Sequence, residues 1–216
     1  MNARNLSGTN EPKKNKTSAW IVALVAAGAI SGTAYARPEW ADPAKGMTVL
    51  CGFLDPNYIR TPCTSKSKQD TRDKWRRHLG TDFKVVASAT VVAPVTGKVI
   101  YFDASASKAA DEAFLVIEDG KTGEEHVIGH IVSNLWKGAD VVKGKPIGSV
   151  RDQGSATHVH WGFNISSGQA AVETAMKKKT PCLQNNKMVD CKWGWGKAPY
   201  EATDAEIRAL GWRNVL

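Results

Sequence analysis

The chain has 216 residues, a formal net charge of +8 at pH 7, four cysteines and five histidines. This length is enough for one domain with a sizeable core and short extensions. The positive charge suits a polyanionic surface such as a cell wall or a lipid leaflet, and the lack of a basic-aromatic motif in the sequence argues against a nucleic-acid partner.

The N-terminus has the organisation of a secretory signal. Basic residues at 4–16 precede a 12-residue apolar run at 19–30, and small residues follow at Ala34 and Ala36. The run is too short to span a bilayer, which takes about 20 residues. We therefore expect residues 1–36 to be a signal peptide cleaved after Ala36. The alternative is an uncleaved anchor, which would be the protein's only membrane contact. Both place the protein in the periplasm, at the cell surface or outside the cell.

The cysteines indicate an oxidising compartment. They stand at 51, 63, 182 and 191 without a C-x-x-C pair, which favours disulfides over a zinc finger. Three connectivities are possible, and Cys51–Cys63 with Cys182–Cys191 is the local one. Residues 37–70 are rich in Pro, Asp, Lys, Thr and Ser. We interpret them as an irregular segment that a disulfide holds against the main domain.

Residues 71–168 carry the pattern of a β domain. The stretch at 83–103 has β-branched runs broken at Pro94 and Gly97. Residues 113–132 are typical of a hairpin that turns at Asp119–Gly120 and Gly123. A short strand follows the Gly-Lys-Pro turn at 144–146, and residues 157–165 form the last strand. Many short strands with glycine turns predict a mainly β fold, an antiparallel sandwich or open barrel.

Residues 169–216 are predicted to be a C-terminal extension. Trp193 and Trp195 alternate like strand residues, and we expect them to pack on the barrel rather than stack on sugars. Thr203 and Glu206 fit a capping box, and Gly211 fits a helix stop. The extension should therefore contain a short C-terminal helix.

Two histidines lie one residue apart in the last predicted strand. Val159, Trp161 and Phe163 alternate with His158 and His160, so one face should pack on the core. The other face would carry both imidazoles, with backbones about 7 Å apart. This distance lets both side chains reach one small site.

A second motif supplies two further ligand candidates. His78 and Asp82 would lie about 13 Å apart in a regular strand. A bend at Gly80 would bring them together, because glycine permits sharp bends. Catalytic zinc takes three protein ligands and keeps one position for water. His78, Asp82 and one histidine of the H-x-H pair form such a set.

At these residues the chain resembles the lysostaphin-like zinc endopeptidases of the cell wall. That family carries an H-x(3)-D motif, here His78–Asp82, and an H-x-H motif, here His158–His160. A histidine after a small residue lies between them, matching Gly129–His130. The resemblance implies that Zn²⁺ is bound by His78, Asp82 and His160, with His130 and His158 as catalytic residues facing the water and the scissile carbonyl.

One departure from the family is visible just before H-x-H, where Ala156–Thr157 replaces the common Gly-Pro. His126, the remaining histidine, is interpreted as a surface or strand-end residue. Residues 37–70, including Asn57, are hypothesised to cover the metal.

The expected function is hydrolysis of peptide bonds in peptidoglycan, with other cell-envelope proteins as additional partners. The main alternative is a non-enzymatic wall-binding protein that activates another wall hydrolase. An envelope-binding module with an adventitious metal site and a small-molecule carrier domain of similar architecture are further alternatives. A complete set of ligands and auxiliary histidines favours the enzyme.

Overall fold

The computed structural model describes residues 41–55, 77–103, 113–165, 171–184, 187–194, 196–199 and 201–216. All of them lie in the unit that spans Ala36–Leu216. The predicted signal segment lies outside the described residues, as do Asn57, Cys63 and Trp195. None of the helices among the described residues has the length and apolar character needed to cross a membrane.

A ten-stranded sheet dominates the fold, and all of its strand pairs are antiparallel. Along the sheet the order is β1 (Thr48–Cys51), β3 (Gly80–Lys84), β10 (His158–Asn164), β7 (Glu125–Val132), β6 (Ala113–Asp119), β5 (Gly97–Asp103) and β8 (Asp140–Val141). Three more strands pair at its margins: β4 (Thr90–Val92), β9 (Pro146–Val150) and β14 (Trp212–Arg213). The predicted mainly β antiparallel fold is confirmed.

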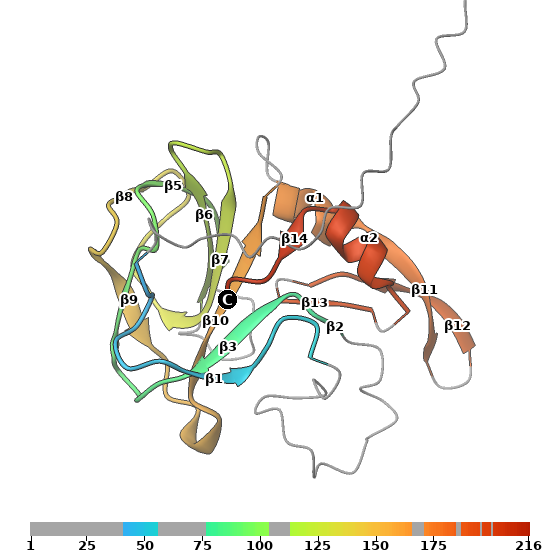
Figure 1. The fold of residues 1–216 in the computed structure, drawn as a ribbon, viewed down its shortest axis with the longest axis horizontal. Helices are drawn as coiled ribbons and strands as arrows, with labels where there is room; N and C mark the ends of the chain where they lie inside the picture. Colours follow the sequence, from blue (N-terminus) through green and yellow to red (C-terminus); the bar gives the residue numbers. More distant parts are fainter. Residues whose placement is uncertain are drawn as a thin grey trace, which may run out of the picture. The chain divides into compact units, whose positions relative to one another are not determined.

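Smaller elements flank this sheet. Two short sheets pair β2 (Arg77–His78) with β13 (Lys197–Ala198), and β11 (Lys179–Gln184) with β12 (Lys187–Lys192). The helices are α1 (Ala171–Lys177) and α2 (Asp204–Ala209), and a 3-10 turn spans Gly154–Ala156. Figure 1 shows both helices and the β11–β12 hairpin on one side of the strands, with β8 and β9 on the other.

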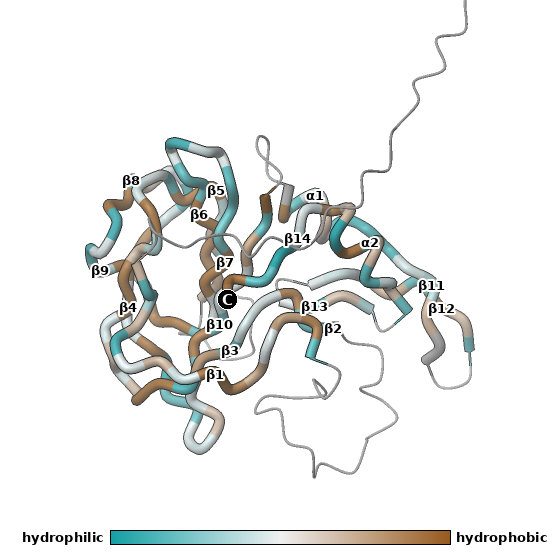
Figure 2. The backbone as a smooth tube through the Cα atoms, in the orientation of Figure 1, coloured by the Kyte–Doolittle hydropathy of each residue, from teal (hydrophilic) through white to brown (hydrophobic). Residues whose placement is uncertain are grey.

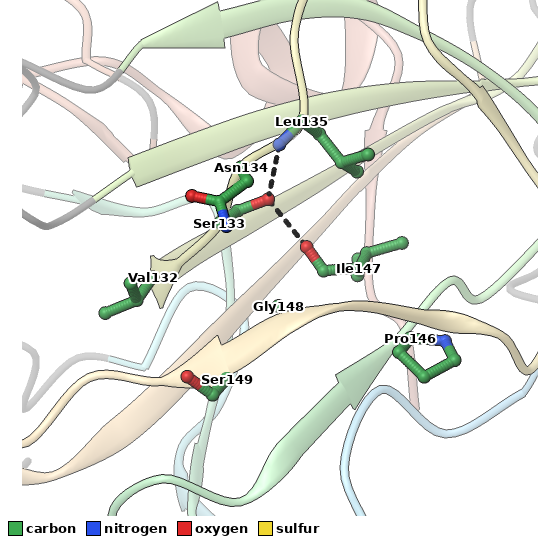
Figure 3. A pocket seen from close by; sticks show the side chains of 8 residues that line it. All are labelled: Val132, Ser133, Asn134, Leu135, Pro146, Ile147, Gly148 and Ser149. Carbon is green, nitrogen blue, oxygen red and sulfur yellow. Dashed lines mark hydrogen bonds between the residues drawn. The ribbon is translucent and has the colours of Figure 1, made fainter.

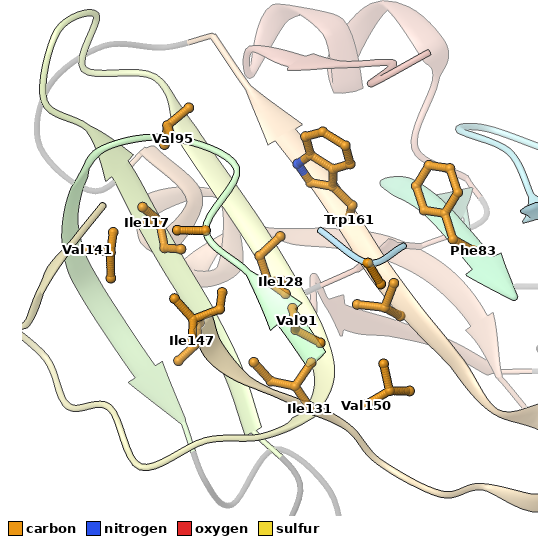
Figure 4. Close-up of a cluster of buried hydrophobic side chains, with 14 of the residues drawn as sticks. Phe83, Val91, Val95, Ile117, Ile128, Ile131, Val141, Ile147, Val150 and Trp161 are labelled. Atoms are coloured by element: carbon orange, nitrogen blue, oxygen red, sulfur yellow. The ribbon is translucent and has the colours of Figure 1, made fainter. Parts of the chain in front are cut away.

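Two apolar clusters lie on opposite faces of the sheet. The first contains Trp161 and Phe163 of β10 with Ile128 and Ile147, as Figure 4 shows in part. The second contains Trp212 with side chains from the extension, among them Trp193, Ile207 and Val172. In Figure 2 much of β4, β7 and β9 is brown, whereas the turn between β6 and β7 is teal. Because each fully buried large apolar side chain contributes about 1.5–3 kcal/mol, these clusters fix which face each strand presents.

The predicted turns are confirmed. The Asp119 carboxylate accepts hydrogen bonds from the Lys121 and Thr122 amides, at 2.7 and 3.3 Å. Gly123 and Gly144 both have a φ of +74°, a conformation that glycine adopts without steric cost. These turns fix the β6–β7 hairpin and the start of β9.

The extension also follows several predictions. Thr203 and Glu206 form the capping box of α2, and Gly211 follows that helix with a φ of +90°. Trp193 is buried, and its Nε1 donates to Thr180 Oγ1 at 3.0 Å. Cys182 and Cys191 form a disulfide between β11 and β12. The helix α1 and this hairpin were not expected, because their short runs lack a clear hydrophobic period.

The N-terminal segment is more ordered than the irregular stretch predicted for residues 37–70. Thr48–Cys51 forms β1 and pairs with β3, because its backbone completes the hydrogen bonds at the edge of the sheet. Cys51 is buried and disulfide-bonded. Its predicted partner, Cys63, lies outside the described residues.

Candidate metal centre

Three predicted ligands meet at one point inside the fold. His78 Nε2 lies 3.1 Å from Asp82 Oδ1 and 3.2 Å from His160 Nδ1, and His160 Nδ1 lies 2.9 Å from Asp82 Oδ1. All three side chains are buried. The structure therefore brings together one atom from each predicted ligand.

The strand register explains this convergence. His160 on β10 pairs directly with Asp82 on β3, so their side chains share one face of the sheet. The strand is interrupted at Leu79, between β2 and β3, and this interruption turns His78 back toward Asp82. The bend predicted at Gly80 thus lies one residue earlier.

Gly80 has a different role, which is to leave room for a ring. A Cβ atom at Gly80 would lie 2.6 Å from His160 Cε1 and 2.7 Å from the carbonyl oxygen of Trp161. A Cβ atom at Gly196, which precedes β13, would lie 2.7 Å from the same Cε1. The imidazole of His160 therefore lies between two glycine backbones.

The donor set fits a divalent metal ion. His78 Nδ1 donates to the Gly52 carbonyl oxygen at 2.8 Å, so in the neutral ring Nε2 carries a lone pair directed at Asp82 Oδ1. These two acceptors lie 3.1 Å apart and need a shared positive charge, either a proton or a metal cation. Zinc bonds of about 2.0–2.1 Å give tetrahedral edges of about 3.3–3.4 Å, close to the spacing of the three atoms.

The electrostatics of the site favour the protonation states that bind metals. Burial by itself raises the pKa of the Asp82 carboxyl. The charge of His78 and the hydrogen bonds of His160 and His78 outweigh burial and hold this pKa well below 3.8. Burial lowers the pKa of His160 below 6.5, although Asp82 opposes this shift. An ionised carboxylate and a neutral imidazole are the forms that coordinate metals.

His158 faces the cluster from the same strand. Its Nδ1 donates to the Ala156 carbonyl oxygen at 2.7 Å, and its Nε2 lies 3.8 Å from Asp82 Oδ2. Within the described parts of the chain, this Nε2 has no hydrogen-bond partner. Burial, and next the charge of His130, lower the pKa of His158 to about 4. The ring is therefore neutral at pH 7, with a lone pair beside the ligands.

His130 reaches the site through a β-bulge. The register of β6 against β7 shifts between Ala113 and Leu115, so β7 carries an extra residue there. His130 has a φ of +63°, and its ring centroid lies 4.2 Å from that of His158. Bulges of this kind re-aim a side chain beside functional sites. Gly129 is required next to it, because a Cβ there would lie 2.2 Å from Phe114.

His126 is not the surface or strand-end residue that the sequence suggested. It is buried, and its Nδ1 accepts a hydrogen bond from Trp161 Nε1 at 3.1 Å. Burial lowers its pKa to about 3. The extra residue in the bulge places His126 and His130 on opposite faces of the sheet, so only His130 joins the site.

A pocket of about 380 Å³ opens at the end of β7, two residues beyond His130 (Figure 3). Ser133 bridges its two sides, since its hydroxyl donates to the Ile147 carbonyl oxygen at 2.6 Å. The pocket is lined by Val132, Ser133, Asn134, Leu135, Pro146, Ile147, Gly148 and Ser149. None of these carries an imidazole, thiol or carboxylate, so the candidate chemistry lies at the histidine cluster instead.

The comparison with protein families agrees with the site. Residues 76–174 match the sequence model of Peptidase family M23. The chain contains a peptidase family M23 domain. This domain includes all three candidate ligands together with His130 and His158. No curated protein matches the chain.

Three solved structures are similar to parts of this chain. Csd3 of Helicobacter pylori is 20% identical over 58% of this chain and 29% of its own, with a TM-score of 0.39. A zinc-containing peptidase from Vibrio cholerae is 22% identical over 68% of this chain and 37% of its own, with a TM-score of 0.40. The catalytic domain of lysostaphin from Staphylococcus simulans is 22% identical over 43% of this chain and 71% of its own, with a TM-score of 0.36. The chain therefore spans less than two-fifths of the first two proteins.

Two contributors to the site were not identified from the sequence. Gly52 offers only a backbone carbonyl to His78, and Gly196 offers only space to His160. Both lie outside the M23 domain, in the N-terminal segment and the C-terminal extension. Backbone contributions of this kind leave no pattern of residue types, although the glycine-rich run around Gly196 is a weak signal.

Proposed function

We propose that the protein is an exported, zinc-dependent endopeptidase that hydrolyses peptide bonds in peptidoglycan stems or cross-bridges. The observation that carries this proposal is the convergence of His78 Nε2, Asp82 Oδ1 and His160 Nδ1 inside an M23 domain. Two imidazoles and a carboxylate are a ligand set of catalytic zinc, which keeps a further position for water or substrate.

In this proposal His78, Asp82 and His160 hold the metal. When bound, zinc supplies a Lewis acid and lowers the pKa of its water toward about 7. His158 accepts the proton of the attacking water at Nε2, the lone-pair nitrogen that faces Asp82. General-base assistance of this kind contributes about 10²–10⁴-fold.

His130 is the second auxiliary residue. Its bulged, left-handed backbone brings its ring against His158. From there an N–H of His130 donates to the oxygen of the scissile carbonyl as negative charge develops. Donors fixed in advance at such an oxygen stabilise the transition state most when water is excluded.

Substrate and location rest on the sequence. The resemblance to lysostaphin-like enzymes indicates peptidoglycan, and the net charge of +8 suits an anionic wall. The signal-like N-terminus and the disulfides support export, because disulfides persist in oxidising compartments. A non-enzymatic activator would not require a full ligand set with two auxiliary histidines beside it.

Mass spectrometry of peptidoglycan fragments tests this function. The zinc-loaded full chain should generate new amine and carboxyl ends, and the mass of the fragments identifies the bond that is cut. His160→Ala should generate none because it lacks a ligand. His158→Ala should retain zinc and lose most of the activity. If the wild-type chain binds zinc and releases no new ends from any peptidoglycan type, the proposal is wrong.

A further inference from the structure

A short backbone stretch before the M23 domain holds His78 from two sides. The carbonyl oxygen of Gly52 accepts a hydrogen bond from His78 Nδ1 at 2.8 Å. The amide of Leu54 donates to the main-chain oxygen of His78 at 3.0 Å. The ring and the backbone of one candidate ligand are therefore fixed by residues 52–54, which lie outside the matched domain.

This stretch is itself anchored at both ends. Cys51 is buried and disulfide-bonded, and it pairs in register with Asp82 across β1 and β3. Phe53 and Leu54 pack against the second apolar cluster. Leu54 has a φ of +56°, a conformation that non-glycine residues rarely adopt. The surrounding contacts hold this uncommon conformation in place.

We propose that residues 51–54 are a positioning element of the metal site, with the Gly52 carbonyl setting the tautomer of His78. This inference rests on the metal site of the proposed function. A carbonyl oxygen only accepts, so Nδ1 must carry a proton, and in the neutral ring Nε2 then presents its lone pair toward Asp82 and His160. Outer hydrogen-bond partners of this kind fix the orientation and basicity of a ligating imidazole.

The disulfide at Cys51 anchors this positioning element through a covalent bond. Cys51 is adjacent to Gly52 and opposite Asp82, so its anchoring fixes the distance between the carbonyl that orients one ligand and the strand that carries another. Loss of this anchor should free residues 52–54 from His78 without changing any ligand. Metal affinity should then fall by about 10–100-fold, the usual effect of removing an outer partner.

Two substitutions at Leu54 test the element in the full-length chain. Both remove the same side chain, but proline also lacks the amide that donates to His78 and cannot adopt a positive φ. Glycine retains the amide and adopts that conformation readily. We expect Leu54→Pro to weaken zinc binding about 10–100-fold in chelator competition and Leu54→Gly to change it less than about threefold.

A second pair of variants keeps the test independent of how well Leu54→Pro folds. Cys51→Ser/Cys63→Ser removes Cys51 with its sequence-predicted partner, whereas Cys182→Ser/Cys191→Ser removes the disulfide of the β11–β12 hairpin. Both lose a cross-link and should lose thermal stability. Only the first should weaken zinc binding and shift the Co²⁺ ligand-field spectrum.

The tautomer of His78 is a readout that general destabilisation would not move. In the metal-free wild type, at a pH at which the ring is neutral, ¹⁵N NMR of the imidazole should show the proton on Nδ1, and Leu54→Pro should show a mixture of tautomers. Wild-type zinc affinity in both Leu54→Pro and Cys51→Ser/Cys63→Ser would overturn the inference. Zinc binding with these ratios but no cleavage of peptidoglycan would support the inference and remove the proposed function. A wild type that binds no zinc would overturn both.

Discussion

The two faces of strand β10 are equally buried and chemically opposite. Val159, Trp161 and Phe163 lie in the first apolar cluster, whereas His158 and His160 lie at the candidate metal centre. On the apolar face most contacts are non-directional and contribute mainly to stability. On the imidazole face each nitrogen needs a partner of matching charge and direction, and the proposed metal ion would be such a partner.

Burial alone therefore does not distinguish structural residues from candidate functional ones. Each face also has a histidine of β7 beside it, His126 on the apolar side and His130 on the imidazole side. Substitutions on the first face should affect folding, and substitutions on the second should affect metal binding and catalysis.

The largest effect is expected on the apolar face. Trp161→Ala should lower the free energy of unfolding of the metal-free protein by about 3–5 kcal/mol, because it leaves a large cavity and removes the donor to His126. Urea unfolding followed by circular dichroism measures this. Val86→Ala, at a side chain that is 75% exposed, is the control and should stay within about 0.5 kcal/mol. A loss below about 1 kcal/mol for Trp161→Ala would contradict the assignment of this face.

On the opposite face the loss should appear in binding instead. His160→Ala should weaken zinc binding by more than about 100-fold, which is the upper end of the effect expected for removing a hydrogen-bond partner of a ligand. The free energy of unfolding of its metal-free form should change by less than about 2 kcal/mol, because His160 belongs to neither apolar cluster. Isothermal titration with zinc, beside urea unfolding, separates the two quantities. Unaltered zinc affinity would remove His160 from the site.

The pH dependence of stability should report His126. Its pKa falls from 6.5 when exposed to about 3 when folded, because burial penalises the charged ring. Between these values the unfolded chain binds the proton and the native protein does not. Stability therefore decreases as the pH falls below 6.5, by up to about 1.4 kcal/mol per pH unit from this group. Urea unfolding between pH 7 and 4.5 should show a smaller slope for His126→Gln, and an equal slope would contradict its buried, neutral state.

The smallest effect is expected at the bulge. His130 adopts a φ of +63°, so His130→Gly should be more stable than His130→Ala by about 1 kcal/mol. Both variants should retain zinc, and both should lose activity. Equal stability of the two variants would show that the left-handed conformation at this position is not required.

Much of this arrangement could be predicted from residue patterns. The alternation in β10 predicted its two faces, and the turn residues at Asp119 and Gly123 predicted the β6–β7 hairpin. The spacing of His78 and Asp82 predicted that a break in the strand would join them. These features are local, and they depend on residue types at fixed spacing.

The rest depends on the register and on backbone contacts. His126 and His130 have the same parity in the sequence, and only the pairing of β6 with β7 reveals the extra residue between them. The hydrogen bond from His78 to Gly52 joins residues 26 positions apart through a carbonyl that every residue type carries. The break at Leu79 likewise follows from pairing of β2 with β13, far along the chain.

X-ray absorption at the zinc edge of the zinc-loaded full-length protein identifies the ligands of the bound metal. We expect one zinc ion per chain, with two imidazole nitrogens and oxygen atoms as the remaining ligands, at about 2.0–2.1 Å. His160→Ala should lose at least one of these two imidazole signals. Sulfur ligands at about 2.3 Å would assign the metal to the cysteines and contradict a centre built from His78, Asp82 and His160.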